Sequence, residues 1–223
     1  MPVSIIGGTG NEGFGLALRW ARAGIDVVIG SRDAGRAADA ADAARAQLGE
    51  GEVSGLANPE AAAAADVVVV AVPFAGQAAV YASIAEHVQP EAVVVDCTVP
   101  LAAATGGKPT RVLGVWEGSA AQQAAGILPK GALVCGAFHT LSAPILRNLD
   151  RTLEGDVLVC GPRAAKPAVR KLVDALPEMR FVDAGPLENA RLVEPLTALL
   201  IGINRRYKVH GAGIRITGLP TAE

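Results

Sequence analysis

The sequence predicts an α/β protein with a doubly wound parallel sheet, and two patterns lead to that fold class. Short apolar runs alternate with longer segments of helical pattern through the first 138 residues, which is typical of parallel strands joined by crossover helices. The run at 66–72, DVVVVAV, is apolar and mostly β-branched after its first residue, as expected for a strand that is covered on both faces.

Each element of this first part is expected from its local pattern. The runs expected to form strands are 3–7, 25–30, 53–56, 66–72, 92–97 and 132–138. The segments expected to form helices are 14–23, 33–48, 59–65, 76–87 and 119–127. Asp33 is the expected N-cap of the second helix, and a loop rich in Gly, Thr and Pro is expected at 101–110.

The regular alternation of short apolar runs and helical segments changes after about residue 136. A loop is expected at 139–150, followed by a strand at 156–160, a helix at 164–176, a strand at 180–183 and a long apolar helix at 187–206. We therefore expect two domains, a larger one at 1–136 and a smaller C-terminal α/β domain at 137–223.

Composition and charge exclude several classes of protein. Apolar residues make up 51% of the 223-residue chain, which is typical of a globular protein. The net charge is −2 and no long basic run occurs, so nucleic acid is not an expected partner. The apolar runs are too short to cross a bilayer, and the N-terminus enters the first expected strand without a signal peptide. We therefore expect no membrane partner.

The three cysteines are Cys97, Cys135 and Cys160, and they lie far apart in the sequence. They have neither a metal-ligand spacing nor the pattern of a disulfide framework. Because they lie in apolar runs, we interpret them as packing residues. The sequence therefore favours a reducing, cytoplasmic environment and predicts no metal site.

A glycine-rich turn follows the first expected strand. Gly8, Gly10 and Gly13 match G-x-G-x-x-G between a strand and a helix, which is the context that the motif requires. In that motif Gly8 permits the tight turn, Gly10 lets the backbone approach a pyrophosphate, and Gly13 lets helix and strand pack closely. The phosphates then lie at the helix N-terminus. A purely structural turn is the alternative, but this context favours a dinucleotide and hence a Rossmann-type sheet.

The end of the second expected strand indicates which dinucleotide binds. An NAD site usually has Asp or Glu about 20 residues beyond the glycines, where it holds the ribose 2′-hydroxyl. Here Ser31 and Arg32 occupy that place, and Arg36 follows one helical turn later. A hydroxyl and two guanidinium groups suit a 2′-phosphate, which a carboxylate would repel. The sequence therefore favours NADP over NAD, with two solvated surface arginines as the alternative.

Several segments together resemble one enzyme family. The segments GGTGNEGFGLALRWARAG, IGSRD, AFHT, DVLVCG and DAGPLENARLVEPLT are similar to those of the NADPH-dependent deazaflavin oxidoreductases, also called coenzyme F420-dependent NADP reductases. The resemblance extends from Val3 to about Ile216. It implies a two-domain homodimer that passes a hydride between NADP(H) and the 8-hydroxy-5-deazaflavin coenzyme F420. The C-terminal domain would complete the deazaflavin pocket and contribute to the dimer contact.

The same resemblance implies a set of residues that bind NADP. These are Thr9, Gly10, Asn11, Glu12, Ser31, Arg32 and Arg36, together with Val72, Gly76, Val99 and Ala137. Geometry supports most of the second group, because Val72, Val99 and Ala137 lie at or just beyond the C-terminal ends of expected strands, where such sheets bind ligands. Ordinary core packing is the alternative for these apolar residues.

His139 and Thr140 form the most polar point of the expected ring pocket. Two interpretations stay open for the histidine: a hydrogen bond to the deazaflavin or the nicotinamide amide, or a loop histidine whose hydrogen bonds are satisfied locally. Arg205, Arg206 and Lys208 could meet the anionic deazaflavin tail, although a basic helix C-terminus is explained by the helix dipole alone, and we favour the dipole.

No residue is assigned as catalytic. Hydride transfer between two stacked rings needs position and a dry pocket, and the cofactors supply the chemistry. The sequence lacks a Tyr-x-x-x-Lys pair, a Gly-x-Ser-x-Gly elbow and a complete P-loop. Two alternatives stay open: an NADPH-dependent reductase of an imine, a ketone or a ferric chelate, and a non-catalytic module that senses NADP(H).

Overall fold

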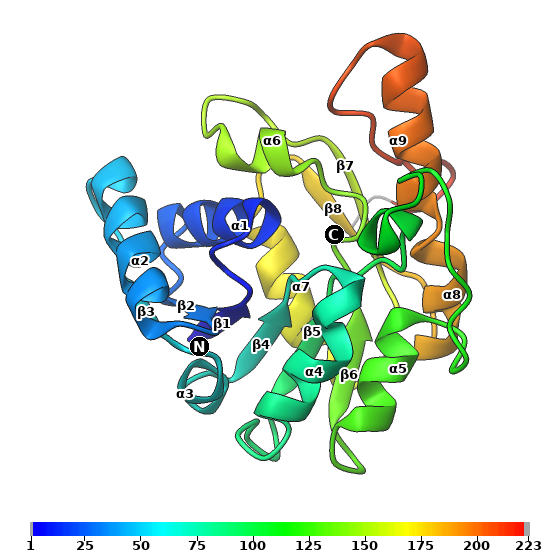
Figure 1. Ribbon diagram of the computed structural model, residues 1–223. Helices are drawn as coiled ribbons and strands as arrows, with labels where there is room; N and C mark the ends of the chain where they lie inside the picture. Colours follow the sequence, from blue (N-terminus) through cyan, green and yellow to red (C-terminus); the bar gives the residue numbers. More distant parts are fainter. Residues whose placement is uncertain (1, 221–223) are drawn as a thin grey trace.

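A computed structural model describes residues 2–220 of the chain (Figure 1). Six parallel strands form the main sheet in the order β3-β2-β1-β4-β5-β6. Their bounds are β1 (Val3–Ile6), β2 (Val27–Ser31), β3 (Val53–Ala57), β4 (Val67–Val70), β5 (Val93–Asp96) and β6 (Leu133–Gly136). The strand order reverses between β1 and β4, as in a doubly wound Rossmann sheet, so the predicted fold class is confirmed.

Five helices cover the two faces of this sheet. They are α1 (Asn11–Arg22), α2 (Ala34–Leu48), α3 (Asn58–Ala63), α4 (Phe74–Ile84) and α5 (Ala120–Ile127). The alternation of side chains along β1 defines two cores, since Ile5 packs with α1 and α2 while Ile6 packs with α3, α4 and α5. Asp33 is the N-cap of α2 as predicted, because its carboxylate accepts a hydrogen bond from Arg36 N at 2.9 Å.

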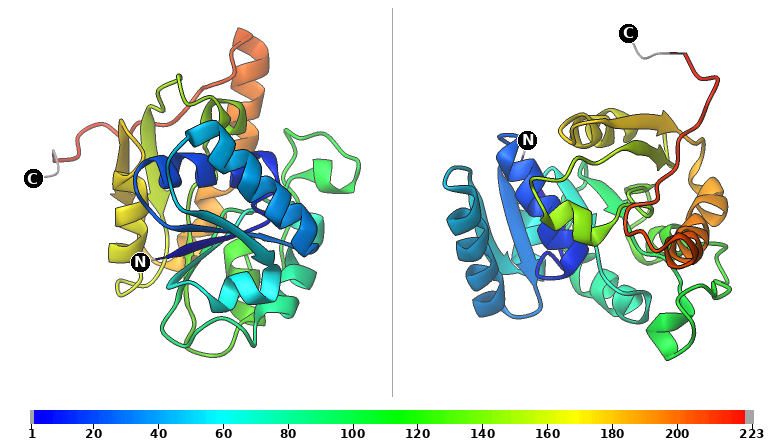
Figure 2. Two further views of the ribbon diagram at one scale, coloured as in Figure 1. Left: turned by 90° about the vertical axis from the view of Figure 1, so that its left-hand side faces the viewer. Right: turned by 90° about the horizontal axis from the view of Figure 1, so that it is seen from above.

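Beyond β6 the chain adds a second, two-stranded parallel sheet. It comprises β7 (Gly155–Val159) and β8 (Met179–Asp183), joined by α7 (Lys166–Asp174). Paired backbone hydrogen bonds between Gly136 and Cys160 attach this sheet to the end of β6. Trp20 Nε1 donates to the carbonyl of Leu172 at 2.9 Å, so α7 packs directly against α1 (Figure 2). The domain boundary at 136 stays a prediction.

Two expectations for this C-terminal part were wrong. The segment 139–150, expected to be a loop, contains α6 (Ala143–Arg147). The single helix expected at 187–206 is instead a 3₁₀ turn, η2 (Leu187–Asn189), then α8 (Ala190–Val193) and α9 (Leu196–Tyr207). Pro195 separates the two helices, because it has no N–H to donate and its ring crowds the preceding turn.

Smaller differences concern element ends. The expected loop at 101–110 includes a 3₁₀ turn, η1 (Ala102–Thr105). Helix α1 begins three residues earlier than predicted, and α4 begins two residues earlier and ends at Ile84 instead of His87. The early start of α1 matters most, because it brings the helix N-terminus directly to the glycine turn.

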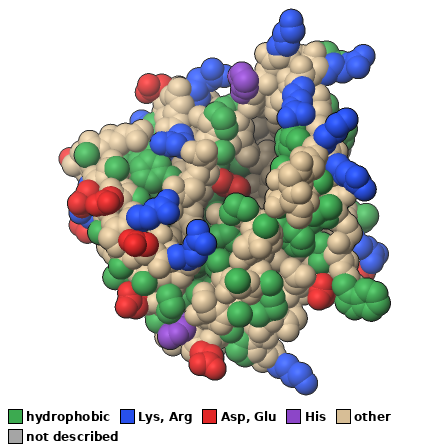
Figure 3. All heavy atoms as spheres, viewed as in Figure 1, with side chains coloured by type: hydrophobic (Ala, Val, Ile, Leu, Met, Phe, Trp, Pro, Cys, Tyr) green, Lys and Arg blue, Asp and Glu red, His purple; other side chains and the backbone are tan. Residues whose placement is uncertain are grey.

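The segment after α9 returns along α6 and β7 (Figure 2). Ser142 Oγ donates to the carbonyl of His210 at 2.6 Å, and Asp156 N donates to the carbonyl of Ile214 at 2.7 Å. In space-filling view, the face of Figure 1 is hollowed between the side that carries α1 and the side that carries α9 (Figure 3). Among the described residues, no helix has the length and apolar character needed to span a membrane.

Candidate functional site

The glycine turn joins β1 to α1 through contacts that leave no room for side chains. The left-handed backbone conformation lies at Gly7, with φ of 81°, and not at Gly8, to which the sequence assigned the tight turn. Gly8 is required for a different reason, because a Cβ there would lie 2.8 Å from the carbonyl oxygen of Ile5. A Cβ on Gly13 would lie 2.8 Å from the carbonyl oxygen of Gly7, so its predicted packing role is confirmed.

Gly10 is the N-cap of α1, and no described side chain makes a capping hydrogen bond there. The first N–H groups of the helix therefore point away from the sheet edge without an intrahelical partner. Free N–H groups and the positive end of the helix dipole favour a phosphate at this point.

A cleft of about 510 Å³ opens beside the turn. Seven of the residues expected to bind NADP line it: Thr9, Gly10, Ser31, Arg32, Arg36, Val72 and Gly76. Both arginines are exposed, and neither guanidinium makes a hydrogen bond or ion pair with the part of the chain that the structure describes. A Cβ on Gly76 would meet nothing within 4 Å, so the cleft is open there.

The structure does not bring four other expected residues into this cleft. Asn11 Oδ1 accepts a hydrogen bond from Arg147 Nη1 at 2.7 Å. Glu12 turns inward, where its Oε1 is buried without a partner among the described residues. Ala137 is fully buried, and its N–H donates to the carbonyl of Asp96 at 3.1 Å. Val99 is half-buried, three residues beyond β5.

Asn58 is a cleft residue that the sequence analysis missed. It is the first residue of α3, it is buried, and its Oδ1 has no partner among the described residues although it lines the cleft. An unpartnered amide oxygen in a polar cleft is available to accept from a ligand hydroxyl or amino group. The Asn-Pro pair at the start of a helix is a turn signal and gave no hint of a ligand.

A second cleft, of about 600 Å³, lies between the loop after β6 and α9. His139 and Thr140 line it, so the structure brings these two expected residues together. Thr197 Oγ1 donates to the carbonyl of His139 at 2.8 Å, which fixes the backbone of the loop against α9. Arg205 and Lys208 line the same cleft.

The imidazole of His139 is only 5% exposed, and neither ring nitrogen has a partner among the described residues. Burial lowers its pKa to about 4, so the ring is neutral at pH 7. The described residues therefore do not support the interpretation of a loop histidine with locally satisfied hydrogen bonds. A neutral imidazole with one N–H and one free lone pair remains available at the edge of the cleft.

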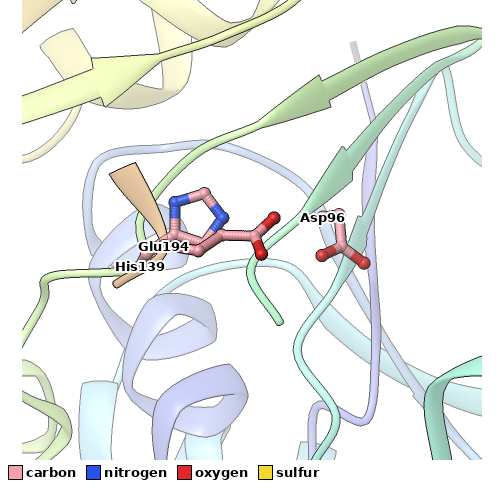
Figure 4. Close-up of side chains that lie close together, drawn as sticks. All are labelled: Asp96, His139 and Glu194. Carbon is pink, nitrogen blue, oxygen red and sulfur yellow. The ribbon is translucent and has the colours of Figure 1, made fainter. Parts of the chain in front are cut away.

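Behind His139 lie two buried carboxylates that the sequence analysis did not identify (Figure 4). Asp96 ends β5 and accepts hydrogen bonds from Gln77 Nε2 and Tyr81 Oη, each at 2.8 Å. Glu194 follows α8 and accepts from the backbone N–H groups of Ala120 and Ala121 at 2.9 and 3.0 Å, at the N-terminus of α5.

Burial raises the pKa of these carboxyl groups. The pKa of Asp96 is about 6, held down in part by its donors, and that of Glu194 is about 7. Burial, with the nearby charge of Asp96, raises the pKa of Glu12 to about 8. One atom each from Asp96, His139 and Glu194 lie within 4.8 Å of one another, so the three side chains form one polar cluster at the carboxyl edge of the sheet.

Comparison with known proteins identifies the family to which this chain belongs. The model of the family described as "NADP oxidoreductase coenzyme F420-dependent" matches residues 2–100. The F420-dependent NADP reductase of Methanothermobacter thermautotrophicus is 44% identical over 227 residues, covering all of this chain and 97% of that relative. The enzyme of the same name from Methanocaldococcus jannaschii is 40% identical, covering 98% and 99% of the two chains. This chain belongs to the F420-dependent NADP reductase family.

Solved structures agree with the family assignment. A putative F420-dependent NADP reductase from Arthrobacter superposes with a TM-score of 0.81 at 26% identity, over 96% of this chain and 98% of that one. A pyrroline carboxylate reductase from Plasmodium falciparum with NADP bound has a TM-score of 0.59 at 12% identity, over 93% of this chain and 66% of that one. The second likeness shows a shared fold alone.

Proposed function

We propose that the chain transfers a hydride between NADP(H) and coenzyme F420. The observation that carries this proposal is the pair of unpartnered guanidinium groups beside the glycine turn, in a chain that is 40–44% identical over its length to F420-dependent NADP reductases. Family membership supports the reaction, and the geometry supports the place of each cofactor.

NADP occupies the first cleft in this proposal. The pyrophosphate lies at the N-terminus of α1 against Thr9 and Gly10, and the 2′-phosphate lies between Ser31, Arg32 and Arg36. Asn58 accepts a hydrogen bond from the adenosine, which uses its free Oδ1. Val72 and Gly76 line the same cleft on the side toward the nicotinamide. Val99 and Ala137 lie outside the cleft, beyond the ends of β5 and β6, and are proposed to contact the nicotinamide there.

The deazaflavin occupies the second cleft, which is lined only by residues after 136. This supports the assignment of the C-terminal part as the segment that completes the deazaflavin pocket. His139 and Thr140 hold the polar edge of a ring. The two rings stack with their reacting carbons roughly 3–3.5 Å apart, and no protein group contacts the transferred hydrogen.

A homodimer in the cytoplasm completes the proposal. Large apolar side chains on α8 and α9 support a protein contact there, since Leu192, Leu199 and Tyr207 are 63%, 58% and 70% exposed. Exposed apolar residues gathered on one helical segment are typical of an interface.

The test is to mix the protein with NADPH and oxidised coenzyme F420 and to follow the visible absorption band of the deazaflavin. Loss of the band with matching NADPH consumption supports the proposal. Turnover of an imine, a ketone or a ferric chelate without loss of the band would support the alternative reductase. Tight NADPH binding with no acceptor reduced would leave an NADP(H)-sensing module.

A further inference from the structure

Three carboxyl groups, each with at least one buried oxygen, lie near one another at the end of the sheet where we place the nicotinamide, and none has a cationic partner among the described residues. They are Glu12, Asp96 and Glu194, and no ion pair between described residues includes any of them. Asp96 and Glu194 are 0% and 1% exposed. Buried carboxylates without a cation are costly, so such groups tend to hold a proton.

The cluster is connected to the second cleft through His139. In Figure 4 the Glu194 carboxylate lies between the imidazole of His139 and the carboxylate of Asp96. His139 lines the cleft, and both of its ring nitrogens are free among the described residues. A neutral imidazole can accept a proton on one nitrogen and donate the proton of the other. It can therefore pass a proton without storing one.

The reaction requires a proton in addition to the hydride. When NADPH reduces the deazaflavin, the C4–H bond of the dihydronicotinamide breaks and its electron pair forms a C–H bond at C5 of the deazaflavin. A ring nitrogen of the deazaflavin then takes up a proton. The balance is NADPH plus oxidised deazaflavin plus H⁺, giving NADP⁺ plus reduced deazaflavin. The nicotinamide changes from neutral to cationic in the same step.

We propose that Glu194, together with Asp96 and His139, is a proton store coupled to the charge of the nicotinamide. The cluster holds a proton while the nicotinamide is reduced, and it releases that proton through His139 when the ring becomes cationic. This inference rests on the proposed function. In doubly wound sheets the nicotinamide half of a dinucleotide lies over the ends of the strands beyond the switch point, which are β4, β5 and β6 here.

The physical basis is electrostatic. A cation near buried carboxyl groups favours their ionised form, and the effect is strong where water is excluded. Burial raises the pKa of Glu194, while its two backbone N–H donors favour the ionised form and oppose that rise. The other titratable or polar groups that face this cluster among the described residues are Glu12, Gln77, Tyr81, Cys97, Thr98, Ser119 and Cys160. None of them is a cation at pH 7.

Proton release on binding tests this directly and without turnover. Calorimetric titrations of the protein with NADP⁺ and with NADPH are run at pH 7 in two buffers of different ionisation enthalpy. The 2′-phosphate is common to both nucleotides, so its titration cancels in the difference. If the cation lowers the pKa of the store by about one unit, NADP⁺ binding releases about 0.4 proton more than NADPH binding. The NADP⁺ affinity relative to NADPH then rises about fivefold from pH 6 to pH 8.

Glu194→Gln should abolish both the extra proton release and the pH dependence of the affinity ratio, while NADPH still binds. Glu188→Gln, at an exposed position in η2, is the matched control and should keep both. If thermal melting shows that Glu194→Gln does not fold, the inference is tested with Asp96→Asn and with the pH dependence of the NADP⁺ to NADPH affinity ratio in the unmodified protein. Equal proton counts for the two nucleotides would overturn the inference.

Retention of the extra release in Glu194→Gln would also overturn it, and loss of the release in Glu12→Gln would then identify Glu12 as the group that titrates. Failure of the proposed function looks different, since NADPH would then not bind, or the deazaflavin band would not respond to NADPH at all.

Discussion

The regions where we place the adenosine and the nicotinamide differ in charge, in burial and in how they are encoded. The proposed adenosine end is cationic, with exposed arginines, and its groups come from two short stretches, 7–10 and 31–36, with Asn58 added. The proposed nicotinamide end has buried carboxyl groups and an imidazole, and these groups come from β5, the loop after β6 and the end of α8. In our proposals the first end recognises a fixed charge on the ligand, whereas the second responds to a charge that changes during the reaction.

The largest expected effect concerns the fixed charge. Arg32→Ala should lower the kcat/KM for NADPH by roughly 10- to 150-fold, because loss of a charged hydrogen-bond partner costs about 1.5–3 kcal/mol. The kcat/KM for NADH should change little, since NADH has no 2′-phosphate. Steady-state rates with both nucleotides give the comparison, and Arg163→Ala, at another exposed arginine, is the control. Equal losses for NADPH and NADH would contradict the 2′-phosphate assignment.

A second prediction concerns the pH dependence of stability and the carboxyl group of Glu12 in the first turn of α1. The pKa of Glu12 is raised in the folded state from 4.5 to about 8, so the folded state binds more protons than the unfolded one between these values. Its contribution to stability is fully present below about pH 4.5 and is lost as the pH rises toward 8. The stability of Glu12→Gln relative to the unmodified protein should therefore rise by roughly 3–4 kcal/mol between pH 5 and pH 8.

Urea unfolding at pH 5 and at pH 8 measures this difference. Glu50→Gln, an exposed carboxyl group in the loop after α2, serves as control and should show no change between the two pH values. The pKa of His139 is shifted in the other direction, from 6.5 to about 4, so its contribution is present above pH 6.5 and is lost as the pH falls toward 4. A stability gain of Glu12→Gln that is the same at both pH values would argue against a protonated Glu12.

A third prediction tests the hydroxyl beside the arginines. Ser31 is buried at the end of β2, and its Oγ accepts only a long hydrogen bond, 3.3 Å from Asp33 N. Ser31→Ala should lower the preference for NADPH over NADH by roughly threefold to tenfold, as loss of one hydrogen bond costs about 0.5–1.5 kcal/mol. The ratio of the two Kd values is the measurement, and an unchanged ratio would remove Ser31 from the phosphate site.

The adenosine end could be predicted from the sequence because its information is local. A strand, a glycine turn and a helix start lie within residues 3–13, and the cation that replaces the usual acid lies directly at the end of the next strand. Each of these features has its own short-range pattern. The position of the left-handed glycine and the place of Asn58 in the cleft were missed, since both depend on how the turn packs against β2 and β4. Asn11 and Glu12 were expected in the cleft and lie outside it.

The nicotinamide end could not be predicted in the same way. Asp96 is one polar residue at the end of an apolar strand, and Glu194 stands one residue before Pro195 in an apolar segment. Nothing in either pattern shows that α8 returns over α5 to place Glu194 at its N-terminus. Helix α6 was missed for a similar reason. Arg19 holds α6 and the residues that follow it through hydrogen bonds to four backbone carbonyls between positions 145 and 151, and these contacts are tertiary. The break between α8 and α9 could have been predicted from the sequence, because a proline at position 195 interrupts the helical pattern.

The smallest expected effect separates two explanations for the basic end of α9. Arg205 and Arg206 both lie in the last turn, where a cation stabilises the helix by about 0.3–1 kcal/mol. Only Arg205 also lines the second cleft. Arg205→Ala and Arg206→Ala should therefore lower stability equally, whereas only Arg205→Ala should raise the KM for coenzyme F420, by about twofold to fivefold, as an exposed ion contact is worth roughly 0.2–1 kcal/mol. The same KM in both variants would mean that the helix dipole explains both arginines.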